Sequence, residues 1–432
     1  MISNLPIKGC NDWMPDEFVK RYYIFEKWRE VCTLFGYEEY LTPILENADL
    51  YRKKSGEELG GTELLVIPKD DIDMALRPEM TPSVTRMVSR IYNHVPKPIR
   101  LFSIANFYRY QKPQKGRNRE FWQLNCDIFG VNSVYSDFEI LQLAIEILRT
   151  FGANENNFVL LLNNRKFINF VLLQKYKIKE ELVPKILSII DKFKKLDLDT
   201  FKKELTDCNL NNDSIEQIEK LCTENEFDVK PLLDEYADTT KDYSFMELLD
   251  LIEKSEYKKF IKVSPTLVRG LAYYDGIVFE IFDKKTIDNK NTNNIDILNR
   301  SIFGGGRYNG LAELFGIKDM PAVGFAPGDE TTKIFLENNN LLHVERNKNR
   351  YYLPILDPNL FKDIAFLGKK LRSINYIVIN GTHIQSIPKA LEYANKNKYT
   401  HVIIYGIDEQ KQQIYTIKDL NTGEEIKYKF LI

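Results

Sequence analysis

The stretch Leu267-Val-Arg-Gly-Leu-Ala-Tyr-Tyr-Asp-Gly-Ile-Val-Phe-Glu280 places one cation, two adjacent tyrosines and two acids within an apolar, strand-like run. Burying a guanidinium such as that of Arg269 costs free energy unless an anion meets it. The rings of Tyr273 and Tyr274 offer apolar surface, and their hydroxyls need hydrogen-bond partners. The stretch therefore fits two structures equally well: the wall of a pocket for a small anionic ligand, or a sheet strand whose arginine reaches solvent.

The composition indicates a globular protein with two or three domains. The chain has 432 residues, of which 44% are hydrophobic and 28% are charged, and this is enough for several separate cores. The formal net charge of −2 gives no overall basic field, although a local basic patch could still bind RNA. The first residues carry neither an apolar signal core nor an arginine-rich leader, and no window approaches ~20 apolar residues. We therefore expect a cytoplasmic protein without a membrane span.

Cysteine and histidine usage argues against a metal centre. The five cysteines show no paired spacing and the four histidines form no ligand-like pair, so neither a disulfide scaffold nor a zinc site is expected. The chain has no Walker loop, and no Gly-x-Gly-x-x-Gly follows a strand and opens a helix. The run Gly304-Gly-Gly306, taken by itself, predicts a bulge or a tight turn.

Beyond the opening stretch, the sequence predicts two strand-rich parts separated by a helical module. In residues 161–262 glycine almost vanishes and helical periodicity dominates, which predicts an insertion between 1–160 and 263–342. After a polar linker, residues 350–432 alternate strands and helices, as in a small α/β domain with a partly parallel sheet. The Asn-rich stretch Asn289–Asn299 predicts a long hairpin loop.

Several elements are predicted in the first part of the chain. Apolar spacing indicates a helix over residues 16–35, and Gly36 is well placed to end it. A strand is expected over 37–45 and a second helix over about 81–93, opened by Thr-Pro. Residues 97–130 are typical of a β-hairpin with a long loop.

The second strand of this hairpin alternates cleanly between apolar and polar residues. One face carries Trp122, Leu124, Cys126 and Ile128, and the other carries Arg119, Gln123, Asn125 and Asp127. A solvated sheet face would explain the alternation equally well. Solvent-facing strands, however, usually favour Lys, Thr and Glu, so we interpret the polar row as part of a pocket.

Three arginines lie in strand-like or pocket-like contexts, namely Arg77, Arg109 and Arg269. Arginine forks match the geometry of carboxylate and phosphate groups. Several of them at one site would suit phosphoryl or nucleotidyl transfer, in which positioning and charge stabilisation provide most of the catalysis. Glu79 and Asp127 supply the opposite charge. Cations and acids in one cleft suggest a zwitterionic ligand such as an amino acid.

The predicted hairpin loop, Lys112-Pro-Gln-Lys-Gly-Arg-Asn-Arg119, is a local basic patch. It could contact a phosphate backbone. Charge runs of this kind are more often simply solvated, and the loop by itself does not decide between the two.

Ordered motifs along nearly the whole chain resemble those of histidyl-tRNA synthetase, a class II aminoacyl-tRNA synthetase. The matching segments are Gly9-Cys-Asn-Asp12, Phe35–Pro43 (motif 1), Leu76-Arg-Pro-Glu-Met-Thr81, Tyr108–Gly130 (motif 2), Arg269-Gly-Leu-Ala-Tyr-Tyr274, Gly304–Tyr308, Pro321–Phe325 and Asp419–Glu425. The resemblance implies an α+β fold with a class II antiparallel sheet flanked by helices. It also implies a homodimer, with the helical insertion over the tRNA acceptor arm and an anticodon-binding C-terminal domain.

The same resemblance implies an activity and its participants. The enzyme would use ATP and Mg²⁺ to convert histidine to histidyl-adenylate and pyrophosphate, and would then esterify tRNA(His). Histidine would be held by Glu79 and Thr81 with Gln123 at its α-amino group, by Asp127 and Tyr274 at its imidazole, and by Tyr273 in the pocket wall. ATP would be contacted by Arg109, Gln111 and Arg269, with Arg109 at the α-phosphate and Arg269 at the pentacoordinate phosphorus. The acceptor end would meet Lys115 and Arg117.

The chain departs from the family pattern at several positions. Asp127 stands where the family usually has Glu, and Gln111, Ala272 and Asn309 replace other usual residues. Motif 3 of the family usually ends Gly-x-Glu-Arg, and here the matching segment is Gly328-Asp-Glu-Thr331. Losing the contact of that arginine with ATP could cost ~1.5–3 kcal/mol. We interpret the pattern as a subgroup of the family, with Lys333 as a candidate replacement cation.

Two other functions compete with the ligase. A family paralogue regulates ATP phosphoribosyltransferase in histidine biosynthesis without ligase activity, and the loss of the motif 3 arginine favours it. The retained Arg109 and Arg269 and the complete C-terminal domain argue against it. A catalytically inactive RNA-binding or scaffold protein is the remaining alternative.

Overall fold

The computed structural model describes residues 2–53, 58–69, 71–193, 196–223, 228–268, 273–288, 301–344 and 349–430. The chain divides into two compact units, Met1–His343 and Val344–Ile432. None of the helices in the described ranges is long and apolar enough to cross a bilayer. The stretch Asn289–Asn299, predicted as a hairpin loop, lies outside these ranges.

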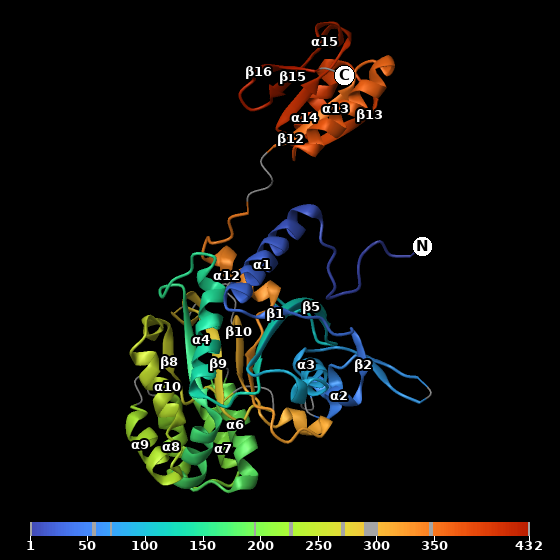
Figure 1. The fold of residues 1–432 in the computed structure, drawn as a ribbon. Helices are drawn as coiled ribbons and strands as arrows, with labels where there is room; N and C mark the ends of the chain where they lie inside the picture. Colours follow the sequence, from blue (N-terminus) through green and yellow to red (C-terminus); the bar gives the residue numbers. More distant parts are fainter. Residues whose placement is uncertain are drawn as a thin grey trace. The chain divides into compact units, whose positions relative to one another are not determined.

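An eight-stranded sheet forms the centre of the first unit (Figure 1). It is antiparallel from β5 through β7, while the outermost pairs, β1 with β5 and β7 with β8, are parallel. In spatial order the strands are β1 (Glu38–Glu39), β5 (Ile99–Tyr108), β6 (Glu120–Phe129), β11 (Ala322–Phe325), β10 (Phe303–Arg307), β9 (Ile277–Asp283), β7 (Phe158–Asn164) and β8 (Ile261–Val263).

Helices cover both faces of this sheet. On one face α1 (Pro15–Leu34) packs against α4 (Val134–Arg149) and α12 (Asp329–Asn338). On the other face α3 (Thr81–Ser89) and the 3-10 helix Leu311–Phe315 share a second apolar core with Phe107 and Phe129. The predicted helix over 16–35 and the predicted hairpin are thus confirmed. The second predicted helix ends earlier than expected, and a 3-10 turn, Tyr92–His94, follows it.

The helical module lies between two paired strands. β7 precedes it and β9 follows it, and these strands pair directly, with Leu162 opposite Phe279. Figure 1 shows α6 to α10 gathered beside the sheet, and α10 packs against α4. The helices of the module are α5 (Arg165–Phe170), α6 (Val183–Lys192), α7 (Leu198–Thr206), α8 (Asn212–Thr223), α9 (Lys230–Thr240) and α10 (Ser244–Glu253).

The strand predicted over 37–45 is wrong as a continuous element. The chain forms β1 and then β2 (Leu45–Asn47), which belongs to a separate three-stranded sheet with β4 (Met74–Leu76) and β3 (Val66–Ile67). Pro43 has no backbone N–H to donate to a ladder. The carbonyl of Thr42 instead accepts a hydrogen bond from Arg77 Nη1 at 2.7 Å.

The second unit is a small α/β domain with its own apolar core. Its five-stranded sheet has the order β13-β12-β14-β15-β16 and is parallel at β13-β12-β14 and antiparallel beyond. The predicted partly parallel sheet is therefore confirmed. Its elements are β12 (Arg350–Ile355), α13 (Phe361–Ser373), β13 (Ile377–Ile384), α14 (Ile387–Lys396), β14 (His401–Ile404), α15 (Ile407–Gln412), β15 (Ile414–Asp419) and β16 (Glu425–Lys429).

The glycine run Gly304–Gly306 forms the middle of β10, so the predicted bulge or turn is wrong. Its glycines are required by close packing of neighbouring strands. A Cβ on Gly305 would overlap the carbonyl oxygen of Gly324 and would meet the Phe325 Cβ at 2.5 Å. The ladder therefore has no room for a side chain at this position.

We expect Gly305→Ala to lower the free energy of unfolding by about 1–3 kcal/mol, because the strands must move apart to admit the methyl group. Urea denaturation followed by circular dichroism measures this change. Gly310→Ala is the matched control, since nothing lies within 4 Å of its added Cβ. Equal stability of the two variants would contradict the close packing of β10.

Candidate active site

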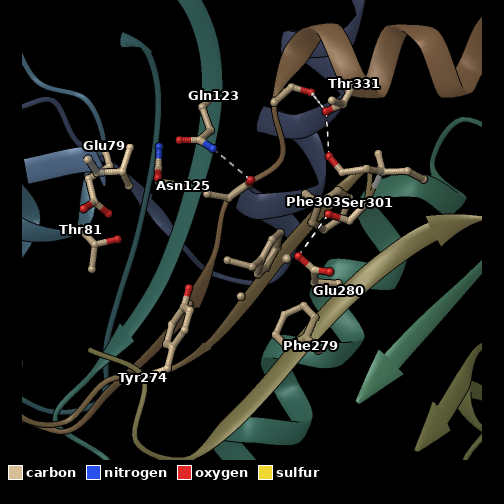
Figure 2. Close-up of a pocket in the computed structure, with 18 of the residues that line it drawn as sticks. Glu79, Thr81, Gln123, Asn125, Tyr274, Phe279, Glu280, Ser301, Phe303 and Thr331 are labelled. Atoms are coloured by element: carbon tan, nitrogen blue, oxygen red, sulfur yellow. Dashed lines mark hydrogen bonds between the residues drawn. The ribbon is translucent and has the colours of Figure 1, made fainter. Parts of the chain in front are cut away.

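A cavity of about 610 Å³ opens on the face of the sheet formed by β6, β9, β10 and β11 (Figure 2). Pockets of this size hold nucleotide-sized ligands. Residues of β6, of the segment before α3, of the 111–118 loop and of α6 in the helical module line it together. The cavity therefore draws on parts of the chain far apart in sequence.

The polar face of β6 forms one wall. Gln123 and Asn125 line the cavity (Figure 2), as does Asp127. Leu124 and Cys126 are fully buried on the opposite face. The interpretation of the polar row as part of a pocket is confirmed for the three polar residues named above, whereas Arg119 is not among the described residues that line the cavity.

The carboxylate of Asp127 is enclosed by neighbouring strands in this wall. The Tyr308 hydroxyl donates to its Oδ1, and Gly324 on β11 leaves it space, since a Cβ there would overlap the carboxylate. Burial raises the pKa of Asp127 to about 7, and the Tyr308 hydrogen bond opposes this rise. A carboxylate that titrates near neutrality inside a pocket can accept an N–H from a ligand.

Tyr308 was not predicted from the sequence as a site residue. Its role depends on the pairing of β10 with β11 and β6, which brings together residues 181 positions apart in the chain. The available signal was the glycine run immediately before it, which marks a close approach of strands.

Glu79 and Thr81 line the cavity beside the tyrosine pair. The hydroxyl of Tyr273 donates to Glu79 Oε2 at 2.7 Å, and its ring centroid lies 5.1 Å from that of Tyr274. Burial, together with the Glu79 charge, raises the pKa of Tyr273 well above its usual value, so the hydroxyl keeps its proton. An acid and several hydroxyls in one pocket suit a ligand ammonium group.

Two amides complete this wall. Gln123 Nε2 donates to the carbonyl of Ala326 at 3.1 Å. Asn125 Nδ2 is buried and has no hydrogen-bond partner in the part of the chain that the structure describes. A buried N–H without a partner favours a ligand that supplies an acceptor. Asn125 was part of the predicted polar row but was not among the predicted ligand contacts.

Arg109 and Arg117 bring positive charge to the cavity. Arg109 Nε donates to the carbonyl of Pro78 at 2.9 Å, and its guanidinium lies 5.0 Å from the ring centroid of Phe121. Burial lowers the pKa of Arg109, but a guanidinium remains charged at neutral pH. Gln111 also lines the cavity and donates from Nε2 to the carbonyl of Asn118 at 2.8 Å.

Other predicted residues lie elsewhere. Arg269 is outside the described residues. Lys115 is not among the described residues that line the cavity. Lys333 is not among them either, and its Nζ pairs with Glu17 Oε2 on α1 at 2.7 Å. At the motif 3 position the Thr331 hydroxyl donates to the carbonyl of Ile302 at 2.7 Å.

Arg77, one of the three arginines considered from the sequence, is not among the described residues that line the cavity. Its guanidinium is 1% exposed and donates to the backbone carbonyls of Thr42 and Asn106. It connects two segments of the backbone beneath the site. The same charge and donor geometry that suit a phosphate also suit two carbonyls, and the sequence does not separate these uses.

Two acids at the start of α12, Asp329 and Glu330, line the cavity and pair with an arginine of α1. Arg21 forms ion pairs with both, at 2.6 Å between Nη2 and Glu330 Oε2. Asp329 also accepts the backbone N–H of Trp122 at 3.2 Å. This pairing reduces the repulsion that these acids would exert on an anionic ligand. It spans more than 300 residues of sequence, and no local pattern signals it.

Comparisons with known proteins show which family the chain belongs to. The family model for histidyl-tRNA synthetase matches residues 9–329. A histidine–tRNA ligase of Leptospira biflexa is 35% identical over 427 residues, which cover 98% of this chain and 94% of that protein. A histidine–tRNA ligase of Opitutus terrae is 33% identical, with 97% and 94% covered.

Solved structures share the fold. Histidyl-tRNA synthetase of Nostoc sp. PCC 7120 superposes with a TM-score of 0.78 at 21% identity, over 99% of this chain and 97% of that one. A Bacillus halodurans protein described as an ATP phosphoribosyltransferase regulatory subunit/histidyl-tRNA synthetase gives 0.71 at 20% identity, over 93% and 98%. The predicted α+β class II fold is thereby confirmed. The family model, together with relatives above 30% identity over almost the full chain, shows that this protein belongs to the histidyl-tRNA synthetase family.

Proposed function

We propose that the protein is a histidine–tRNA ligase, which activates histidine with ATP and transfers it to tRNA(His). The observation that carries this proposal is one cavity in which Glu79 and Asp127 lie with Arg109. Such a cavity can hold a zwitterion whose side chain carries an N–H beside a phosphate-bearing partner. Relatives named histidine–tRNA ligase match nearly the whole chain.

Histidine would occupy the pocket between β6 and the tyrosine pair. Its ammonium group would bind Glu79 and Thr81, with Gln123 beside them. Its imidazole N–H would donate to Asp127, which Tyr308 orients, and Tyr274 would lie alongside. We base this placement on the charge and position of these side chains in the cavity wall.

In the activation step a carboxylate oxygen of histidine would attack the α-phosphorus of ATP, and the bond to pyrophosphate would break. Arg109 would hold the substrate carboxylate and an α-phosphate oxygen, with Gln111 nearby, and Arg269 would add a second guanidinium. Fixed cations stabilise the charge that develops in such a transition state. A tRNA hydroxyl would then attack the acyl carbon and release AMP.

Mg²⁺ bound to the ATP phosphates would add positive charge and needs only one or two protein carboxylates. Glu280, which lines the cavity and accepts from Ser301 Oγ at 3.2 Å, could supply one. Within the described residues no group of three His, Cys, Asp or Glu forms a dedicated metal site. We do not assign Lys333 to ATP, because its ion pair directs it towards Glu17.

The remaining assignments concern partners and are proposals as well. Lys115 and Arg117 on the motif 2 loop would contact the tRNA acceptor end, and the unit Val344–Ile432 would bind the anticodon. We also propose a cytoplasmic homodimer. Apolar side chains exposed on α1, Phe18 (51%) and Tyr22 (53%), are suited to burial against a second copy.

A regulatory subunit without ligase activity is the second candidate. The Thr331 hydroxyl, bonded to a backbone carbonyl, leaves no cation at the motif 3 position. One structural neighbour is also described partly as a regulatory subunit. The cavity of this chain nevertheless retains Arg109 and the amino-acid pocket, which favours the ligase.

Histidine-dependent exchange of labelled pyrophosphate into ATP, followed by charging of a tRNA(His) transcript, distinguishes the candidates. We expect both activities. Omitting histidine, or replacing it with another amino acid, is the control and should abolish exchange. Histidine binding with neither activity would refute the ligase.

Asp127→Asn should raise the KM for histidine in pyrophosphate exchange by about tenfold or more, because a hydrogen bond to a charged acceptor is lost. The KM for ATP should stay within about twofold, since this contact concerns only the imidazole. An unchanged histidine KM would remove Asp127 from the recognition of the ring.

The same variant should be more stable than the wild type above neutral pH. The folded-state pKa of Asp127 is raised to about 7, so its proton stabilises the fold fully below the unfolded pKa of about 3.9 and this stability is lost as pH rises towards 7. Asparagine carries no such titration. Urea denaturation from pH 4 to pH 8 should show the stability difference growing with pH and levelling above 7. A constant difference would contradict the raised pKa.

A further inference from the structure

Arg165 is held rigidly at the edge of the cavity where the sheet meets the helical module. It is the first residue of α5, directly after β7. Its backbone N–H donates to the carbonyl of Gly276 at 2.8 Å, and its Nη1 donates to the carbonyl of Val268 at 2.6 Å. The side chain is half-buried and lines the same cavity as Arg109.

No acid compensates the charge of Arg165 within the described ranges of the chain. Burial lowers the pKa of Arg165, and no carboxylate contributes to it. Two other buried arginines pair with acids, Arg21 with Asp329 and Arg307 with Asp137 at 2.7 Å. The buried Arg77 donates to backbone carbonyls and is not among the described residues that line the cavity. One hydrogen bond to Val268 leaves a guanidinium with several N–H donors for another acceptor.

A partly desolvated cation that faces a cavity is stabilised when an anion binds there. Arg109 and Arg117 line the same cavity, so Arg165 adds a third positive charge to its wall. Arginine forks match phosphate oxygens in pairs. The arrangement suits a ligand with several phosphates, or a phosphate chain that passes beneath the helical module.

We propose that Arg165 binds a phosphate group of a substrate, which is either the polyphosphate of ATP or the backbone phosphate at the 3′ end of the tRNA. The proposal rests on the ligase function above. Arg165 lies in the first turn after β7, outside the segments that resemble motifs 1, 2 and 3 of the family. The proposed contact would therefore be additional to those motifs.

A purely structural role is the competing explanation, since Arg165 also holds the turn that ends at Val268. Asn163 provides the matched control. Its Nδ2 donates to the carbonyls of Pro265 at 3.1 Å and Leu267 at 2.9 Å, and it is fully buried and not among the described residues lining the cavity. A variant of Asn163 therefore disturbs the same turn without removing a cavity charge.

The test compares the wild type, Arg165→Gln and Asn163→Ala in pyrophosphate exchange and in tRNA charging. Glutamine removes the charge but can still donate to the Val268 carbonyl. We expect Arg165→Gln to raise the KM for ATP by about tenfold or more, as for loss of a charge-assisted hydrogen bond. The histidine KM and the thermal midpoint should not change.

Two results would support the proposal and show which molecule supplies the phosphate. A raised KM for ATP points to the polyphosphate of ATP. Unchanged pyrophosphate exchange with a raised KM for tRNA points to the tRNA backbone. Unchanged KM values for both, or the same increase in Asn163→Ala, would overturn it. If Arg165→Gln does not fold, Arg165→Lys decides, since weaker ATP or tRNA binding supports the guanidinium contact and unchanged binding overturns it.

Failure of the ligase function would be seen separately, as a wild type without exchange or charging. Calorimetric titration of the wild type and Arg165→Gln with ATP then tests Arg165 alone. Weaker binding of ATP, or of a tRNA(His) transcript titrated in the same way, would support the phosphate contact, and equal affinity for both would overturn it.

Discussion

The site depends on one steric constraint, which is the close pairing of β11 with β6 on one side and with β10 on the other. Gly324 lies opposite Asp127 in the β6–β11 ladder, and the absence of a side chain leaves the space that the carboxylate fills. Gly305 lets β10 approach β11 equally closely. This approach brings the Tyr308 hydroxyl onto Asp127. The strands that build the core thereby also shape the part of the cavity around Asp127.

The acids and the arginines that line the cavity differ in how their charges are compensated. The acids of α12 both pair with Arg21, which reduces the repulsion that they exert on an anionic ligand. Arg109 and Arg165 are anchored by backbone carbonyls and keep their charge for the cavity. Because a carbonyl orients a guanidinium without cancelling its charge, these arginines are ready to bind phosphate or carboxylate. The cavity thus has an acid-lined pocket for a cationic group and cations for an anionic one.

Binding and stability make conflicting demands at Asp127. Burial raises its pKa to about 7, so ionisation at neutral pH costs the fold free energy. The same burial strengthens any hydrogen bond that the carboxylate accepts from a ligand. An asparagine would fit the position of Asp127 without this ionisation cost. The presence of an acid there is therefore explained better by a function than by stability.

The sequence by itself determined those features that local patterns encode: helix α1, the β5–β6 hairpin with its polar face, the helical module and the C-terminal α/β unit. It also marked Glu79, Arg109 and Asp127 as candidates, because their motifs are contiguous. Only the tertiary structure decided that Arg77 binds backbone carbonyls, that Lys333 turns to Glu17, and that Tyr308 and Arg165 face the cavity. These outcomes depend on strand order and on contacts between residues far apart in the sequence. The chemistry of a side chain alone does not select its partner, because the same group can bind a backbone carbonyl, an acid or a ligand.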